Sequence, residues 1–465
     1  MRQPGPATPP LDLAHMTTAT QAYRYLHPSA LVDATKPQLA LATSGPMGAE
    51  HPHFFEGQLL QPRLVSELLT AVALVVGKRF FTPANTVAKA IALADPVVTS
   101  GGGYLRFEGF SPCCSTYARV DLLPSAYAGD VVGKGTTNVD FNPPMRAALA
   151  RVSDPRGLGL AIGRDALTLR SGAEEVRERK VALPLRWLRG MLEVQGYLSS
   201  MTRQFSADAV SAQRFLRTLP KASTSRSPLW ITSRPGGLYA TTLPFENGVR
   251  VSEVGRLAVL KDLLARADSL HAYSAEGGQA SAWVLDFGSA RLTVALSAET
   301  WRGFSGEGQA LRALMGQDAE SFGVLQRVRA GLAWQAAVDE PALSAQLGAP
   351  TTKVRDALRV LGSSGLVGFD VFESSYFHRV LPLDLSQVEE LNPRLADARE
   401  LLRAGAVSLD SVEPFRASVA SGDVVHQVRD VEGELRCTCP WFAKHRGDRG
   451  PCKHVLAAEA LRSAA

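Results

Sequence analysis

The cysteines near the C-terminal end constrain the fold of this chain more than any other feature. The sequence has five cysteines in 465 residues, and three of them, Cys437, Cys439 and Cys452, lie close together with His454 beside the last. Thiolate and imidazole groups are the ligands that Zn²⁺ prefers in tetrahedral sites, and two close pairs supply four corners. Because all four corners are protein ligands, no position remains for an activated water. We therefore predict one structural Zn²⁺ per chain, held by Cys437, Cys439, Cys452 and His454.

The residues around these ligands predict a small module with two strands and a helix. Segments 414–420 and 423–429 are rich in apolar and β-branched residues and are joined by a Ser-Gly-Asp turn, which is typical of a β-hairpin. Pro451 suits the start of a helix that runs through His454. The strand region thus presents the first pair of ligands and the helix presents the second.

The ligand spacing, Cys-x-Cys followed by twelve residues and Cys-x-His, resembles that of the SWIM zinc fingers. The similarity covers residues 412–463 and includes the segments Cys-Pro-Trp-Phe and Gly-Pro-Cys-Lys-His-Val-Leu-Ala. It implies a ββα zinc finger that binds DNA or another protein, within a bacterial SWIM zinc-finger family protein. Some bacterial proteins with this finger look like neighbours of MoxR-type ATPases and von Willebrand A-domain proteins, so the resemblance also suggests such a protein partner.

The spacer between the two ligand pairs is basic and lies next to aromatic residues. It carries Lys444, Arg446 and Arg449, and Trp441 and Phe442 stand just before them. Cations flanked by aromatic rings are typical of surfaces that meet phosphate. The spacer is therefore a candidate contact for nucleic acid or for an acidic protein, and a simple solvated face is the alternative.

A second module is predicted at residues 321–385, where helix and strand patterns follow one another closely. A helix begins at Pro341, with Asp339 or Glu340 before it as the cap, and the Gly-Ala-Pro segment at 348–350 ends it. A second helix follows directly, and two apolar segments then flank a Glu-Ser-Ser turn. Helix, tight turn, helix and hairpin in this order resemble a winged helix-turn-helix.

The start of that second helix carries candidate nucleic-acid contacts, because recognition helices contact DNA near their N-terminal ends. The candidates are Thr352, Lys353 and Arg355. The acidic and basic residues of the module balance, however, and affinity for DNA depends heavily on neutralising phosphates. Nucleic-acid contact and protein packing both remain open for this module.

The rest of the chain predicts a large α+β region in two parts. Helical spacing of apolar residues predicts a helix within 61–81, and segments rich in β-branched and aromatic residues predict strands within 96–124 and 269–297. A polar stretch at 206–227 suggests a boundary between an N-terminal region, 21–205, and a central region, 225–318. The predicted fold class is thus multidomain α+β, with a winged-helix-like module and a C-terminal ββα zinc finger.

Composition places the protein among globular chains and excludes several classes. Apolar residues make up 45% of the sequence, and no run of about 18 of them occurs that could cross a membrane. The few cysteines do not form a disulfide scaffold, so we expect a cytoplasmic protein without membrane contact. Residues 1–20 are expected to be a flexible leader, with Met16 as a second candidate start. A net charge of +5 is too small to establish a nucleic-acid partner.

No sequence motif of a known catalytic site stands out. The segment Gly-Asp-Val-Val-Gly-Lys resembles a phosphate loop, but three residues separate its glycines where that motif needs four. We therefore predict a non-enzymatic binding or adapter protein. The alternative is an enzyme or ATPase-associated component whose active site lies within residues 20–320 and is dispersed in the sequence.

Overall fold

The structure is a computed structural model, and it describes most of the chain. The described residues are 30–32, 38–41, 43–44, 53–81, 96–130, 133–139, 146–147, 149–152, 158–163, 185–219, 228–306, 308, 310–311, 319–381, 392–447 and 449–464. The predicted leader, residues 1–20, lies outside them.

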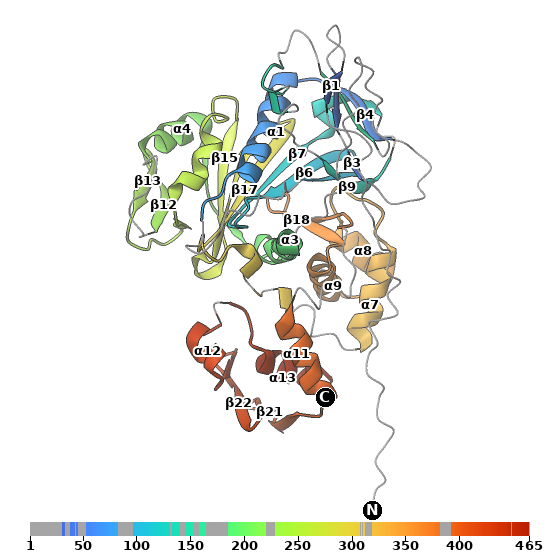
Figure 1. Cartoon of the computed structure of the whole chain (residues 1–465), viewed down its shortest axis with the longest axis vertical. Helices are drawn as coiled ribbons and strands as arrows, with labels where there is room; N and C mark the ends of the chain where they lie inside the picture. Colours follow the sequence, from blue (N-terminus) through green and yellow to red (C-terminus); the bar gives the residue numbers. More distant parts are fainter. Residues whose placement is uncertain are drawn as a thin grey trace, which may run out of the picture.

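A nine-stranded sheet forms the centre of the larger part of the structure, which lies within residues 30–381 and is called the body below (Figure 1). In spatial order its strands are β11 (Thr202–Asp208), β15 (Ser269–Ser274), β16 (Ala280–Asp286), β17 (Ala290–Ser297), β7 (Thr116–Leu122), β6 (Tyr104–Phe110), β5 (Val97–Gly101), β9 (Gly135–Val139) and β3 (Thr43–Ser44). Every neighbouring pair is antiparallel. The strands predicted within 96–124 and 269–297 are confirmed.

Strands from both predicted α+β regions share this sheet. β17 pairs with β7 along its length, from Ala290 opposite Leu122 to Leu296 opposite Thr116. The first half of the polar stretch holds the end of β11 and helix α4 (Ala209–Thr218). The division into two regions stays a prediction, but the polar stretch does not separate two sheets, because long-range strand pairing joins its two sides.

Helices cover both faces of the sheet. On β16, Trp283 and Leu285 belong to one hydrophobic cluster, while the alternate residues Ala282 and Val284 belong to another. This alternation is the two-residue period of a strand buried on both faces. The first cluster contains α1 (Pro62–Gly77), α4, the 3₁₀ turn η4 (Val254–Leu257) and α5 (Ala258–Lys261), and the second contains α3 (Leu185–Leu198). The helix predicted within 61–81 is thus confirmed as α1.

Two smaller sheets and further 3₁₀ turns lie in the described part of the body. A five-stranded sheet has the order β1 (Ala30–Val32), β2 (Gln38–Leu41), β10 (Leu158–Gly163), β4 (His53–Leu59) and β8 (Tyr127–Asp130). A three-stranded sheet has the order β13 (Gly237–Thr241), β12 (Leu229–Arg234) and β14 (Val249–Val251). The 3₁₀ turns are η2 (Pro124–Ala126), η5 (Glu276–Gly278) and η6 (Phe304–Gly306).

The predicted helix and hairpin module packs on the second face of the sheet. Its elements are α7 (Ala319–Ala330), α8 (Glu340–Leu347), α9 (Thr351–Ser363), β18 (Val367–Asp370) and β19 (Ser375–His378). Asp339 caps α8 by accepting a bond from the Ala342 N–H at 2.8 Å, and Gly348 ends the helix in the left-handed conformation. These elements follow the predicted order, while the winged-helix identity stays a prediction.

The C-terminal module is a four-stranded antiparallel sheet with helices beside it. In spatial order its strands are β20 (Val407–Ser411), β21 (Arg416–Ser421), β22 (Val424–Val431) and β23 (Glu434–Cys437), and its helices are α11 (Pro393–Arg403), α12 (Pro440–His445) and α13 (Lys453–Ala464). It has its own core, in which Phe415, Val419 and Val428 pack against α13 through Val455. Among the described residues, no helix is long and apolar enough to cross a membrane.

Candidate metal centre

The four predicted zinc ligands meet in the core of the C-terminal module. Cys437 ends β23, Cys439 is the N-cap of α12, Cys452 stands just before α13, and His454 lies in the first turn of that helix. All four side chains are buried, and one ligand atom from each lies within 4.8 Å of the others. The chain therefore brings together three thiols and one imidazole from three elements, as their spacing predicts.

The donor geometry fits a tetrahedral zinc. The Nδ1 atom of His454 lies 3.7 Å from the Sγ atom of Cys437. Zinc–sulfur bonds of about 2.3 Å and zinc–nitrogen bonds of about 2.0 Å place such atoms about 3.5 Å apart in a tetrahedron. The Nε2 atom of His454 is buried and has no hydrogen-bond partner among the described atoms. The donor set and the distance at Nδ1 support one structural zinc.

Backbone groups and the thiols themselves set the electrostatics of the cluster. The backbone N–H of Phe442 donates to Sγ of Cys439 at 3.3 Å, and that of Val455 donates to Sγ of Cys452 at 3.4 Å. A hydrogen bond with Cys437 lowers the pKa of Cys452 to about 4, and the same bond raises the pKa of Cys437. Thiolates are the zinc-binding form, so metal binding displaces the remaining thiol protons and is pH-dependent.

His426 is a neighbour of the site that sequence reasoning missed. It lies on β22, and its ring centroid is 4.3 Å from that of His454. Burial and the charge of His454 lower the pKa of His426. Nothing in the spacing of His426 relative to the ligands indicates this contact, because it depends on where β22 lies against α13.

Two arginines hold the zinc spacer, Arg394 within the C-terminal module and Arg449 against the body. Arg394 of α11 donates from Nη1 to the carbonyl oxygens of Arg449 at 2.7 Å and Pro451 at 2.8 Å, and its guanidinium lies over the Trp441 ring. Arg449 donates from Nη2 to the carbonyl oxygen of Gly306 in η6 at 3.1 Å. Of the predicted contact residues, Arg449 therefore also joins the module to the body, while Lys444 and Arg446 are exposed.

The predicted contact residues of α9 interact within their own module. The ammonium group of Lys353 lies 3.1 Å from Oγ of Ser321, and Nε of Arg355 lies 2.8 Å from a carboxylate oxygen of Glu340. Thr352 is exposed at the start of the helix. A nucleic-acid role for these residues stays a prediction.

A buried ion network holds the hairpin β18–β19 to the central sheet. Asp370, at the end of β18, lies 3.4 Å from Arg106 and 3.1 Å from Arg119. Asp121 lies 3.1 Å from Arg106 and 2.9 Å from Arg119, and all four side chains are almost completely buried. Burial opposes ionisation of Asp370, but the charges of Arg119 and Arg106 outweigh it and lower its pKa.

A second buried ion pair also joins the hairpin β18–β19 to the central sheet. Nη1 of Arg379, just after β19, lies 2.5 Å from a carboxylate oxygen of Glu108, which also accepts a bond from the hydroxyl of Tyr117. Burial opposes ionisation of Glu108, but Arg379 and Tyr117 outweigh it and lower its pKa. Sequence reasoning missed both groups. The available signal was two charged residues spaced by two in each of β6 and β7, which places both on one face of a strand.

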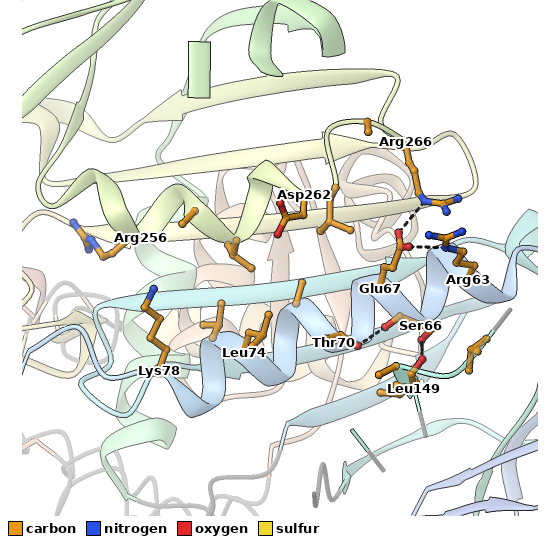
Figure 2. A pocket seen from close by; sticks show the side chains of 18 of the residues that line it. Arg63, Ser66, Glu67, Thr70, Leu74, Lys78, Leu149, Arg256, Asp262 and Arg266 are labelled. Atoms are coloured by element: carbon orange, nitrogen blue, oxygen red, sulfur yellow. Dashed lines mark hydrogen bonds and ion pairs between the residues drawn. The ribbon is translucent and has the colours of Figure 1, made fainter. Parts of the chain in front are cut away.

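A groove of about 1030 Å³ runs between α1 and the segment containing η4 and α5 (Figure 2). Glu67 on its wall is paired with Arg63 at 3.0 Å and Arg266 at 2.8 Å. Leu74 is 60% exposed and borders the same groove. Apolar residues and paired charges both line the groove. The groove holds no group of three or more potential metal ligands, because the one such cluster among the described residues is the zinc site.

Comparison with protein families identifies the C-terminal module. Residues 423–462 match the SWIM zinc finger, which lies within the predicted range 412–463. The match contains all four clustered ligands. The predicted SWIM module is therefore confirmed, and it is a small part of the chain. No curated protein matches this chain in sequence.

Several solved structures align with about half of the chain at low similarity. Proliferating cellular nuclear antigen from Entamoeba histolytica aligns with 53% of this chain and 98% of its own, at 8% identity and a TM-score of 0.32. The PCNA2–PCNA3 complex from Sulfolobus tokodaii aligns with 53% and 100%, at 7% identity and 0.33. Pol III beta from Caulobacter crescentus aligns with 59% and 73%, at 14% identity and 0.30. At these scores the alignments carry no conclusion about fold or function.

Proposed function

We propose that this chain is a non-enzymatic binding protein. Its C-terminal module, called the zinc module below, presents the surface that contacts a partner. One observation carries the proposal: four protein ligands close the metal site inside a module whose sheet leaves its outer side exposed. A closed site stabilises a fold and offers no position for activated water. The chemistry of the site thus supports a structural role for the metal and a binding role for the module.

For the helix and hairpin module, we favour packing over nucleic-acid contact. All four residues of β18 are buried, and Asp370 and Arg379 tie the hairpin to the central sheet. A wing that contacts DNA needs an exposed hairpin. The module then serves as part of the scaffold that carries the zinc module.

The partner is a protein or a nucleic acid. The SWIM match supports an interaction module without naming its target. MoxR-type ATPases and von Willebrand A-domain proteins stay predictions that come from the family resemblance. The exposed cations Lys444 and Arg446 remain candidate contacts for an acidic partner.

The alternative function is an enzyme with its site in residues 20–320. The groove beside α1 is where a substrate would bind in that case, since its volume of about 1030 Å³ is that of a large small-molecule site. Its carboxylate Glu67 lies between two guanidinium groups, and both of its oxygen atoms are already engaged by Arg63 and Arg266. This environment favours the binding protein over the enzyme.

The test is affinity capture by the zinc-loaded protein from its native cell, with and without nuclease, compared with Cys439→Ser. We expect captured material that depends on zinc, because the ligand substitution disrupts the module. Capture that is equal with Cys439→Ser would contradict a binding role for this module. A hydrolytic activity that follows zinc occupancy would contradict the non-enzymatic proposal.

A further inference from the structure

Three arginines form a row across the outer face of the zinc module. Arg416 on β21 stands directly opposite Arg429 on β22, and Arg429 stands directly opposite Arg436 on β23. All three are exposed, while the alternate residues Ala417, Val428 and Cys437 are buried. Because side chains alternate along a strand, the three guanidinium groups lie on the side of the sheet that faces away from the zinc.

This row has little compensation from ion pairs with neighbouring acids. Like charges directly opposite each other destabilise a sheet. No ion pair of Arg416 or Arg429 occurs within the described residues, and Arg436 has a single distant one, 3.9 Å from Glu434, with both side chains exposed. Asp410 on the neighbouring strand is engaged by the hydroxyl of Ser418 at 2.6 Å. An arrangement that is unfavourable by itself becomes favourable when an anion bridges the row.

The shape of the row selects the anion. Guanidinium groups bind phosphate and carboxylate oxygens through paired hydrogen bonds. Neighbouring strands lie about 4.8 Å apart, so the outer arginines start about 9.6 Å from each other. A row of this length can contact successive phosphates of one nucleic-acid backbone, whereas a single guanidinium contacts only one.

The rest of the face favours backbone contact over contact with bases. The row next to the arginines consists of Ser418, Gln427 and Thr438, which are polar and carry no rings. Unpaired bases are usually held by stacking on aromatic side chains, and this row has none. Glu434 lies in the row on the other side, beside the β22–β23 turn, so a phosphate strand avoids it by running across the sheet along the arginines.

We propose that Arg416, Arg429 and Arg436 form a binding site for the phosphate backbone of a nucleic acid, without sequence preference. The inference rests on the proposed binding function of the zinc module and names its ligand. It places the contact on the outer face of the sheet rather than on the spacer around Lys444 and Arg446.

The test is a salt titration of binding to a labelled oligothymidylate and to a duplex of equal length. The full zinc-loaded chain is compared with R416A/R429A/R436A between about 50 and 200 mM salt. The triple variant should lower the slope of log affinity against log salt by about two units on the single strand, or nearer three on the duplex. The arm with the larger loss identifies the single-stranded or duplex source of the phosphates.

Two control variants separate this site from a general effect of charge. R214A/R217A/R403A removes the same charge from exposed positions away from this face, and its slope should match that of the unchanged protein. R416K/R429K/R436K keeps the charge, so it should keep the slope while binding more weakly, because lysine lacks the planar fork of arginine. Zinc content and circular dichroism show that each variant is folded.

Each outcome decides the proposal. Equal losses in slope for the two alanine triples would overturn it, as would zinc-loaded protein that binds neither oligonucleotide at about 50 mM salt. Nuclease-resistant capture of a protein that R416A/R429A/R436A abolishes would also overturn it, in favour of an acidic protein partner. Those results leave the proposed binding function standing, whereas a module that contains no zinc would remove the proposed function itself.

Discussion

The zinc module and the hairpin β18–β19 are both small β elements, and they are held in place by different means. In the zinc module, four ligands within one short segment close around a metal site. The hairpin is held by Asp370 and Arg379, whose partners lie in β6 and β7, more than two hundred residues away in sequence. Both arrangements bury groups that are unfavourable in an apolar core unless each finds its partner.

The zinc and the ion network contribute differently to the stability and to the position of these two elements. A structural zinc contributes free energy of folding directly, so its module depends on the metal. A buried ion pair contributes little relative to apolar residues of the same size, but removing one partner leaves a buried charge and is strongly destabilising. The zinc therefore stabilises its module, and the ion network mainly specifies where the hairpin lies.

Removal of the metal should have the largest effect. Cys439→Ser should lose the zinc and, with it, apparent stabilisation on the order of 10 kcal/mol. Residues 407–464 should then lose protection in hydrogen exchange while the nine-stranded sheet keeps its own, because the two regions have separate cores. Metal analysis and hydrogen exchange are the measurements. Unfolding of the whole chain would show that the comparison between two independent regions is wrong.

Breaking the ion network should have the next largest effect and leave the zinc in place. Asp370→Asn removes one of the two carboxylates that neutralise Arg106 and Arg119. The free energy of unfolding of the body should fall by about 3–5 kcal/mol. Urea denaturation measures it, with zinc content as the second readout.

The exposed pair of Arg436 and Glu434 provides the control for that change. Glu434→Gln should leave the urea midpoint unchanged, because solvent screens this pair. If both substitutions had the same effect, burial would not be what makes the network important.

A smaller effect is expected at the junction between the zinc module and the body. A Cβ atom at Gly308 would lie 2.8 Å from the carbonyl oxygen of Arg449 and would also collide with the guanidinium of Arg394. Gly308→Ala should weaken docking of the zinc module by about 1–3 kcal/mol. Faster hydrogen exchange in the spacer at unchanged zinc content is the expected result. Unchanged hydrogen exchange would mean that docking of the zinc module on the body does not depend on this contact.

The smallest effect is expected at a helix cap in the scaffold. Asp339→Ala removes the acceptor for the Ala342 N–H at the start of α8 and should lower stability by about 1 kcal/mol. Thermal unfolding measures it. A loss as large as that of Asp370→Asn would show that local capping, rather than the buried network, determines the stability of this module.

Local sequence patterns were sufficient to predict the zinc site, the SWIM module and many of the elements. The four ligands come from one short segment, so their spacing was sufficient to predict that they meet. The helix α1 and the start of α8 were also predictable, because apolar periodicity, Pro341 and the cap at Asp339 act within a few residues. The same local patterns predicted the strands from 269 to 297.

How these elements combine depends on contacts between parts of the chain that are distant in sequence. Pairing of β7 with β17 joins both sides of the polar stretch in one sheet. Pairing of β6 with β7 brings together Arg106 and Arg119, which contact Asp370. Strand register likewise places Arg416, Arg429 and Arg436 in one row. Each of these contacts depends on which distant strand becomes a neighbour and in which register. That choice is made by burial of the whole core, whereas local patterns of residues specify only the elements themselves.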